Sequence, residues 1–437
     1  MRLDPSLGRT AAIHTMGCRL NFAESGRMQE QLVEAGFSLV KFGAPAALNI
    51  INSCVVTQQA EREVGQLIRQ AKKAAPTCLV AVMGCAAQVQ RGVAGADLVL
   101  GNEDKFALPN LLKALPTAPQ ATLAQRPTNF WPGATGPRDG HTRSFLKIQD
   151  GCDYVCSYCL IPQARGPARS PEISLILNEA QHLVELGYQE IVLTGVNIGE
   201  FKSPAGENLT ALLQALLKVE GLPRLRISSV EPNTISEELL EVLASSPKAM
   251  GHFHLPLQSG DDEILAKMRR HYDTKLFAQK VKLIKQYFPQ GAIGTDVIVG
   301  FPGESAQHFK NTYDFLQELE ISHFHIFPFS RRPKTIAYTL PAQVAPAVKK
   351  QRAAQLRKLG AAKYQQLTQQ MLGQTAHVLL EEAVTFNGQA GFLGYTENFC
   401  RTFIPQTATA PLATNQIVAV KITSCTNKYL QATLNPV

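Results

Sequence analysis

The sequence contains no long apolar run. No stretch of about 18 uncharged apolar residues occurs among its 437 residues. Near the start, Arg2, Asp4 and Arg9 stand where the apolar core of a secretory leader would lie. We therefore expect a protein without a membrane span that works in the cytoplasm.

The sequence also lacks the cysteine pattern of a small secreted domain. Its nine cysteines are an odd number scattered over a long chain, whereas disulfide frameworks pair even numbers of cysteines in short chains. In a reducing compartment, cysteines that stand in groups indicate a metal centre instead.

Acidic residues are absent from residues 331–370, although the chain as a whole has a net charge of +8. Clustered positive charge suits contact with a phosphate backbone, but a solvated helix face has the same pattern. Both interpretations stay open at this point. The basic residues of this segment are Arg331, Arg332, Lys334, Lys349, Lys350, Arg352, Arg357, Lys358 and Lys363.

Apolar segments alternate with amphipathic ones over residues 1–125, which is typical of a parallel sheet covered by helices. A stretch rich in proline and glycine at 126–143 then predicts a linker. The strand candidates are AAIHT (11–15), LNIIN (48–52), LVAVM (79–83) and DLVLG (97–101), and the helix candidates are 21–35 and 58–75.

A second alternating series predicts six β/α units over residues 144–330, fewer than the eight of a closed barrel. We therefore expect a partial barrel and an α/β fold class. Beyond a basic connecting segment at 331–370, short β-type runs between glycine and asparagine turns predict a small closed β barrel at 371–437. The strand candidates of the partial barrel are 144–148, 190–194, 225–229, 252–255, 293–299 and 323–327.

Three cysteines of the first region, Cys18, Cys54 and Cys85, each stand just past the end of a strand candidate. Because the carboxyl ends of parallel strands meet at one edge of a sheet, we expect the three thiols to lie together. Cys78 precedes its strand and would lie at the opposite edge. Structural thiols, or a zinc site that lacks its fourth ligand, are alternatives, but three corners of an iron-sulfur cluster fit better.

Three further cysteines, Cys152, Cys156 and Cys159, lie in the loop after the first strand candidate of the partial barrel. Such loops form the mouth where barrels of this kind hold their chemistry. The CxxxCxxC spacing lets one loop bind three corners of a 4Fe-4S cluster and leaves the fourth iron without a protein ligand. An open iron can chelate S-adenosylmethionine, whereas a zinc site would need a fourth ligand from elsewhere.

The motifs around these cysteines resemble those of a known family. Over nearly its full length, the chain resembles the methylthiotransferases of the radical S-adenosylmethionine superfamily, and most of all the branch that acts on N6-threonylcarbamoyladenosine of tRNA. The motifs are MGCRLNFAES, INSCVVT and VMGCAAQ, followed by LKIQDGCDYVCSYCLIPQARGPARS, IVLTGVNIG, SSVEP, FHLPLQSGDDEILAKMRR and GTDVIVGFPGES.

The resemblance implies a division of labour between the two groups of cysteines. In this family, an auxiliary 4Fe-4S cluster is bound by the cysteines that correspond to Cys18, Cys54 and Cys85. A second 4Fe-4S cluster, held here by the catalytic cysteines Cys152, Cys156 and Cys159, would bind S-adenosylmethionine and yield a 5′-deoxyadenosyl radical. The expected product is a nucleoside with a methylthio group at C2, next to the tRNA anticodon.

Five residues after the later strands are candidates for contact with S-adenosylmethionine. Gly195 and Asn197 follow the second strand candidate of the partial barrel, and Glu231 follows the third. Gln258 and Asp296 are weaker candidates. A simple turn at Gly195, a helix cap at Glu231 and a satisfied polar group at Asp296 are the structural alternatives.

The last segment resembles the TRAM-like RNA-binding β barrel of this family, through LGYTENFCRTFI. Its net charge is zero, whereas RNA-binding modules are usually basic. Either Tyr395 and Phe399 contact unpaired bases, or the segment 331–370 makes more of the phosphate contacts. The expected partners are the anticodon loop of tRNA and an electron donor such as flavodoxin or ferredoxin, while the sulfur source is unknown.

Three other functions stay open beside the modification of threonylcarbamoyladenosine. Two are family activities, on isopentenyladenosine of tRNA or on an aspartate of a ribosomal protein. The third is a non-catalytic metal-binding protein that binds RNA. It would need the cysteines, but not the glycine-rich and polar loops after the barrel strands.

Overall fold

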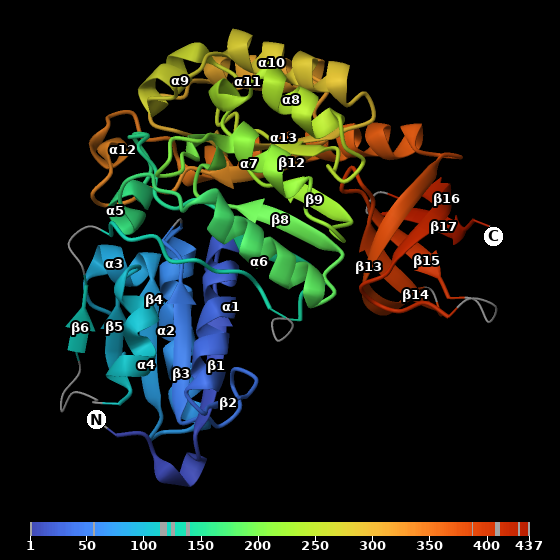
Figure 1. Cartoon of the computed structure of the whole chain (residues 1–437). Helices are drawn as coiled ribbons and strands as arrows, with labels where there is room; N and C mark the ends of the chain where they lie inside the picture. Colours follow the sequence, from blue (N-terminus) through green and yellow to red (C-terminus); the bar gives the residue numbers. More distant parts are fainter. Residues whose placement is uncertain are drawn as a thin grey trace.

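The computed structural model has three regions that follow one another along the chain (Figure 1). A parallel α/β sheet comes first, a half-open barrel lies in the middle, and a small closed β barrel ends the chain. The structure describes residues 2–55, 57–113, 120–123, 127–136, 140–386, 388–406, 411–426 and 429–435.

The first region is a six-stranded parallel sheet in the order β2-β1-β3-β4-β5-β6. Its strands are β1 (Thr10–Thr15), β2 (Ser38–Leu39), β3 (Leu48–Ser53), β4 (Leu79–Gly84), β5 (Leu98–Leu100) and β6 (Gln120–Thr122). Its helices and 3-10 turns are η1 (Pro5–Leu7), α1 (Arg19–Glu34), α2 (Gln58–Ala74), α3 (Cys85–Gln90), η2 (Asp104–Ala107) and α4 (Leu108–Leu111).

Helices cover both faces of this sheet, so its central strands β3 and β4 are buried along their whole length. Ile50 of β3 belongs to the core that contains Met28 of α1, whereas the next residue, Ile51, belongs to the core that contains Leu67 of α2. Successive side chains of a strand point to opposite faces, and a continuous apolar run is therefore the pattern of a strand between two helix layers. The predicted α/β sheet is confirmed.

The middle region contains the six predicted strands, arranged as two parallel three-stranded sheets. One holds β7 (Arg143–Lys147), β8 (Glu190–Thr194) and β9 (Arg224–Ile227), and the other holds β10 (His252–His254), β11 (Ala292–Val299) and β12 (His323–Pro328). Isolated parallel bridges, Leu225 to Ala249 and Ser229 to His254, join the two sheets. The predicted partial barrel is confirmed.

Helices connect these strands and cover the outside of the partial barrel (Figure 1). Most begin at a side chain that accepts a bond from the backbone; for example, Asn208 caps α7 and Ser236 caps α8. The elements are α5 (Ile161–Arg165), α6 (Ile173–Glu185), η4 (Ile198–Glu200), α7 (Leu209–Leu216), η5 (Pro232–Thr234), α8 (Glu237–Ala244), α9 (Asp262–Met268), α10 (Thr274–Tyr287), α11 (Ala306–Glu318) and α12 (Ile336–Thr339).

A long helix, α13 (Pro346–Gln370), joins the partial barrel to the last region and contains most of the basic segment. It packs closely on β12, since a Cβ added at Gly360 would lie 2.9 Å from Cβ of Phe324. Only a glycine allows this approach. The helix therefore has a fixed place on the partial barrel.

The last region is a closed barrel with the strand order β13-β14-β15-β17-β16, as the sequence predicted. Arg224 and Arg226 of β9 donate hydrogen bonds of 2.9 Å to the backbone oxygens of His377 and Glu397 in this barrel. The closed barrel therefore packs against β9, on the side of the partial barrel opposite α5, which follows the second group of cysteines (Figure 1). Its strands are β13 (Thr375–Phe386), β14 (Gln389–Tyr395), β15 (Arg401–Pro405), β16 (Ile417–Cys425) and β17 (Leu430–Leu434).

The domain limits expected from the sequence stay a prediction. The observed elements follow the same order, with β6 ending before residue 125 and β7 beginning at the end of the expected linker. Within that linker, residue 126 and residues 137–139 lie outside the described residues.

Candidate active site

The three cysteines of the first region lie at one edge of the sheet. Cys18 precedes α1, Cys54 follows β3, and Cys85 begins α3 directly after β4. Because β1, β3 and β4 are parallel neighbours, the structure brings the three loops together as expected. Cys78 is buried before β4, at the other edge.

Close backbone packing holds these loops in place. Gly17 has a φ of +91°, and a Cβ added to it would lie 2.7 Å from Sγ of Cys54. The side-chain amide of Asn21 donates to the backbone oxygens of Met16, at 2.8 Å, and Ser53, at 3.1 Å. The loops that carry Cys18 and Cys54 are therefore tied to each other.

The second group of cysteines lies in the loop between β7 and α5, as the sequence predicted. The Cys159 amide donates to the backbone oxygen of Cys156 at 3.1 Å, and the Cys152 amide donates to that of Gly166 at 3.2 Å. Gly151 has a φ of +70°, and a Cβ there would lie 1.8 Å from the backbone oxygen of Pro167. The loop can fold this way only with glycine before the first cysteine.

The thiols of this loop lie in surroundings that keep them protonated until a metal displaces the proton. Burial raises the pKa of Cys159 to about 12, and it also raises the pKa of Cys152 and of Cys156. Arg270 donates from Nη1 to Sγ of Cys156 at 2.9 Å. Buried thiols that resist ionisation become thiolates when a metal takes the place of the proton.

Each of the two groups offers three cysteines that are free of disulfide bonds. Thiolates are the ligands that bind iron-sulfur clusters in proteins. This chemistry fits the 4Fe-4S clusters expected from the sequence.

Asn197 and Glu200 lie beside Cys152. The side-chain amide of Asn197 donates to Glu200 at 3.0 Å, and Glu200 is within hydrogen-bond range of the Cys152 thiol. Oδ1 of Asn197 is buried and has no hydrogen-bond partner among the described residues. A buried acceptor without a partner fits a ligand that donates to it.

Gly195 has a different neighbour from the one expected. A Cβ at Gly195 would lie 2.9 Å from Oε1 of Gln149, and this oxygen accepts hydrogen bonds of 3.0 Å from the amides of Val196 and Asn197. The glycine therefore makes room for Gln149, and its contact with S-adenosylmethionine stays a prediction.

Glu231 is linked to the cysteine loop through Arg270. The Arg270 guanidinium bonds to the Glu231 carboxylate on one side and to Cys156 on the other. Burial raises the pKa of Glu231, although Arg270 opposes this effect. The arginine was not among the residues predicted from the sequence, even though it lies within the motif FHLPLQSGDDEILAKMRR.

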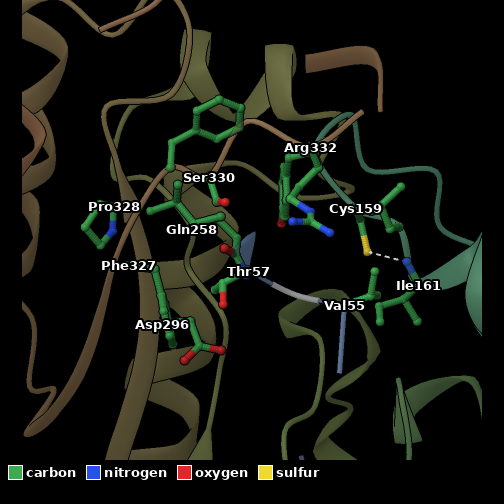
Figure 2. Close-up of a pocket in the computed structure, with 14 residues that line it drawn as sticks. Val55, Thr57, Cys159, Ile161, Gln258, Asp296, Phe327, Pro328, Ser330 and Arg332 are labelled. Carbon is green, nitrogen blue, oxygen red and sulfur yellow. Dashed lines mark hydrogen bonds between the residues drawn. The ribbon is translucent and has the colours of Figure 1, made fainter. Parts of the chain in front are cut away.

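A cavity of about 240 Å³ lies between the first region and the partial barrel (Figure 2). Val55, next to Cys54, lines it from one side, and Cys159 lines it from the other. Gln258 and Asp296 also line it, so two of the predicted contact residues face this cavity rather than Cys152. The remaining lining residues are Thr57, Tyr158, Leu160, Ile161, Ile298, Phe327, Pro328, Phe329, Ser330 and Arg332.

A buried network of charges joins the two cysteine-bearing regions, and the sequence did not reveal it. Glu24 of α1 accepts bonds from Lys105, at 2.5 Å, from Lys147 of β7, at 2.8 Å, and from Arg165 of α5, at 3.0 Å. Asp150 accepts from Lys147 at 2.7 Å and from Arg165 at 3.0 Å. Because unpaired buried charges are costly, this network fixes how the two regions meet.

Most of the basic segment makes contacts within the chain. Lys334 donates to the backbone oxygen of Val89 in the first region at 2.7 Å, and Arg352 pairs with Glu304. Arg332 is buried at the cavity. The cations of α13 that are exposed are Lys350, Arg357 and Lys358.

Tyr395 and Phe399 of the closed barrel face the partial barrel. Their rings stack at 4.5 Å, and Arg143 lies 4.9 Å and 5.0 Å from the two ring centroids. Arg226 lies 5.0 Å from the ring of Phe399. Both rings are half-buried by these contacts within the chain, and the alternative in which this pair contacts unpaired bases stays a prediction.

Residues 146–316 match the Radical SAM superfamily, and residues 10–99 match a family described as Uncharacterized protein family UPF0004. Over 430 residues, the chain is 35% identical to threonylcarbamoyladenosine tRNA methylthiotransferase MtaB of Bacillus subtilis, covering 94% of this chain and 93% of that protein. It is 30% identical over 434 residues to a tRNA-2-methylthio-N(6)-dimethylallyladenosine synthase of Chlorobium luteolum, covering 97% and 96%.

Among solved structures, the radical S-adenosylmethionine methyltransferase TsrM of Kitasatospora setae, with cobalamin and a 4Fe-4S cluster bound, is similar with a TM-score of 0.55. It shares 15% identity, and the match covers 75% of this chain and 77% of TsrM. A likeness at this identity concerns the fold alone.

Within the described residues, no helix is both long and apolar enough to cross a membrane.

Proposed function

Because this chain belongs to the radical S-adenosylmethionine methylthiotransferase family, we propose that it adds a methylthio group at C2 of N6-threonylcarbamoyladenosine, next to the anticodon of tRNA. The observation that carries this proposal is the similarity to threonylcarbamoyladenosine tRNA methylthiotransferases, at 33–35% identity over most of the chain.

Two 4Fe-4S clusters and S-adenosylmethionine are the cofactors of this proposal. Cys18, Cys54 and Cys85 would hold the auxiliary cluster, and the catalytic loop with Cys152, Cys156 and Cys159 would hold the other. When bound, these groups supply a carbon radical that removes hydrogen and the sulfur that replaces it. The chain itself binds, orients and shields the reacting parts.

Residues beside the catalytic loop would position S-adenosylmethionine. The buried Oδ1 of Asn197 can accept a hydrogen bond, and Glu231, held by Arg270, can accept bonds from ribose hydroxyls. Gly195 would act through Gln149, which it allows to hold the Asn197 amide. Gln258 and Asp296 would border the cosubstrate from the cavity side.

The cavity is the proposed place for the modified base. Its lining joins Val55, which follows Cys54, to Cys159, so a base in the cavity would lie between the two cluster sites. The apolar side chains Ile161, Phe327 and Phe329 would cover the ring and exclude water. Figure 2 shows Ile161 and Phe327 among the side chains that line the cavity.

The finer points on partners follow the same proposal. The exposed cations Lys350, Arg357 and Lys358 on α13 would contact the phosphate backbone of tRNA. An electron donor such as flavodoxin or ferredoxin would reduce the catalytic cluster. We place the enzyme in the cytoplasm, where tRNA and reduced thiols are found.

One assay tests the function. Anaerobically reconstituted protein with S-adenosylmethionine, a reductant and threonylcarbamoylated tRNA should yield 5′-deoxyadenosine and a nucleoside that is heavier by one methylthio group. Parallel reactions contain dimethylallyladenosine tRNA or ribosomal protein. If dimethylallyladenosine tRNA or ribosomal protein is modified while threonylcarbamoylated tRNA is not, the substrate assignment is wrong. If none is modified and no 5′-deoxyadenosine forms, the enzymatic proposal itself fails.

A further inference from the structure

Three side chains on neighbouring strands of the partial barrel meet at the edge of the cavity. His254 of β10 lies with Nε2 at 3.0 Å from Oδ2 of Asp296 on β11. His325 of β12 lies with Nδ1 at 3.2 Å from Oδ1 of the same carboxylate. The three ligand atoms lie within 4.8 Å of one another.

The strands are built to bring these residues together. Asp296 and His325 are register partners across β11 and β12, while the partner of His254 on β11 is Gly294. A Cβ at Gly294 would lie 3.0 Å from Nδ1 of His254, so the glycine leaves space for the imidazole to reach Asp296. The two imidazole rings stack at 5.0 Å.

We propose that His254, Asp296 and His325 bind one divalent transition-metal ion. Two imidazole nitrogens and one carboxylate oxygen form a ligand set that suits zinc, manganese or iron, whereas magnesium and calcium prefer oxygen ligands alone. Three protein ligands on adjacent strands occupy one side of such an ion and leave its other positions open.

The open side of the ion would face the cavity. Asp296 lines the cavity (Figure 2), and the His325 side chain is 59% exposed, so an ion can enter from solvent. Nothing in this arrangement involves the six cysteines of the two cluster sites. The site therefore stands apart from the clusters but is next to the proposed place of the base.

A metal here would change which substituent the cavity accepts, and this part rests on the proposed function. With neutral imidazoles, the carboxylate gives the group a negative charge, which repels an anion. A dication reverses the sign and can bind oxygen donors. The threonylcarbamoyl group carries a carboxylate and a urea oxygen, whereas a dimethylallyl group carries no oxygen.

Zinc binding tests the site without any need for activity. Reconstituted protein with both clusters is dialysed anaerobically against zinc, and its zinc and iron contents are measured by mass spectrometry. We expect the unchanged protein to bind about one zinc per chain more than the His325→Gln and Asp296→Asn variants. The zinc affinity of the variants should be at least about tenfold lower. Their iron content should equal that of the unchanged protein.

His377→Gln is the matched control. The His377 side chain is 58% exposed and its Nδ1 lies 2.8 Å from Glu397, so it resembles His325 in exposure and in having a carboxylate partner, but it has no third ligand beside it among the described residues. This variant should keep the zinc of the unchanged protein. Equal zinc contents in the unchanged protein and in folded His325→Gln would overturn the metal site.

A second measurement tests the role in recognition. Zinc should tighten the binding of an anticodon stem-loop with threonylcarbamoyladenosine by about tenfold or more, and leave a stem-loop with dimethylallyladenosine unaffected. If zinc binds but does not tighten the binding of the threonylcarbamoyladenosine stem-loop relative to the dimethylallyladenosine stem-loop, the recognition role is refuted. Zinc that is bound while no tRNA is modified in the activity assay refutes the proposed function and supports the site.

Discussion

The two groups of cysteines are held in different ways. Cys18, Cys54 and Cys85 come from three loops at the edge of a sheet, and their positions depend on the whole first region. Cys152, Cys156 and Cys159 come from one loop whose own hydrogen bonds shape it. A site built by tertiary structure should therefore respond to distant changes in packing, whereas a site built by one loop should respond mainly to changes within that loop.

Removing single cysteines gives the largest expected effects. Cys152→Ala should abolish cleavage of S-adenosylmethionine to 5′-deoxyadenosine, because the catalytic cluster loses a ligand. Cys54→Ala should retain part of this cleavage but lose methylthiolation. Both products are measured by liquid chromatography with mass spectrometry, and Cys425→Ala, outside both groups, serves as the control. Complete loss of cleavage in a folded Cys54→Ala protein would contradict separate roles.

Neutralising the centre of the buried charge network should destabilise the contact between the two regions. Glu24→Gln leaves Lys105, Lys147 and Arg165 without their shared carboxylate. We expect a loss of about 3–5 kcal/mol in the free energy of unfolding, measured by urea titration. Glu263→Gln, an exposed glutamate paired with Lys267, should leave the unfolding midpoint unchanged. A similar midpoint for both variants would refute the role of the network.

The same network predicts how stability depends on pH. Burial opposes ionisation of Glu24, but Arg165, Lys105 and Lys147 outweigh it and hold its pKa well below the usual value. Because the unfolded chain takes up protons first, near its ordinary pKa of about 4.3, stability is full above that pH and falls as the pH decreases below it. Unfolding followed between pH 3 and 7 should show a smaller acid dependence for Glu24→Gln; an unchanged dependence would contradict this assignment.

A glycine substitution should affect one cysteine group and not the other, with a smaller effect than the removal of a cysteine. Gly17→Ala places a methyl group against Sγ of Cys54 and should lower the iron content of the auxiliary site while 5′-deoxyadenosine formation continues. Gly8→Ala also has a positive φ but has nothing within 4 Å of the added Cβ, so it controls for backbone strain. Equal iron contents in the two variants would show that the Gly17 contact is unimportant.

The smallest effects are expected on tRNA binding. Lys350→Ala and Lys358→Ala should each weaken tRNA binding several-fold and reduce the dependence of log affinity on log salt by about 1. Lys310→Ala, on α11 and paired with Asp314, is the control. A salt dependence that is the same for all three variants would remove α13 from the RNA surface.

The sequence predicted the parts of the molecule that depend on local patterns. Apolar runs revealed the six strands of the partial barrel and four strands of the first region, but not the short strands β2 and β6. The position of a cysteine after a strand was enough to bring Cys18, Cys54 and Cys85 to one edge. The closed barrel could be predicted from short β runs between turns. In each case, the periodicity of the side chains follows from the element that they form.

Features that depend on tertiary contact were missed. Glu24 and Arg165 lie in quoted motifs, but nothing in their spacing shows that they are buried together. Arg332 was counted as one of many cations, although it lines the cavity. The packing of Arg143 on Tyr395 and of Arg226 on Phe399 was not predicted either. Pairing across regions leaves no periodic signal in a sequence.

Electron paramagnetic resonance of two triple variants tests the division between the cluster sites most directly. The triple variant Cys18→Ala, Cys54→Ala and Cys85→Ala should keep one reduced cluster, and the spectrum of this cluster should shift when S-adenosylmethionine is added. Alanine at residues 152, 156 and 159 should leave one reduced cluster whose spectrum does not shift. The reverse pattern, or a shift in both variants, would contradict the assignment of S-adenosylmethionine to the loop of the partial barrel.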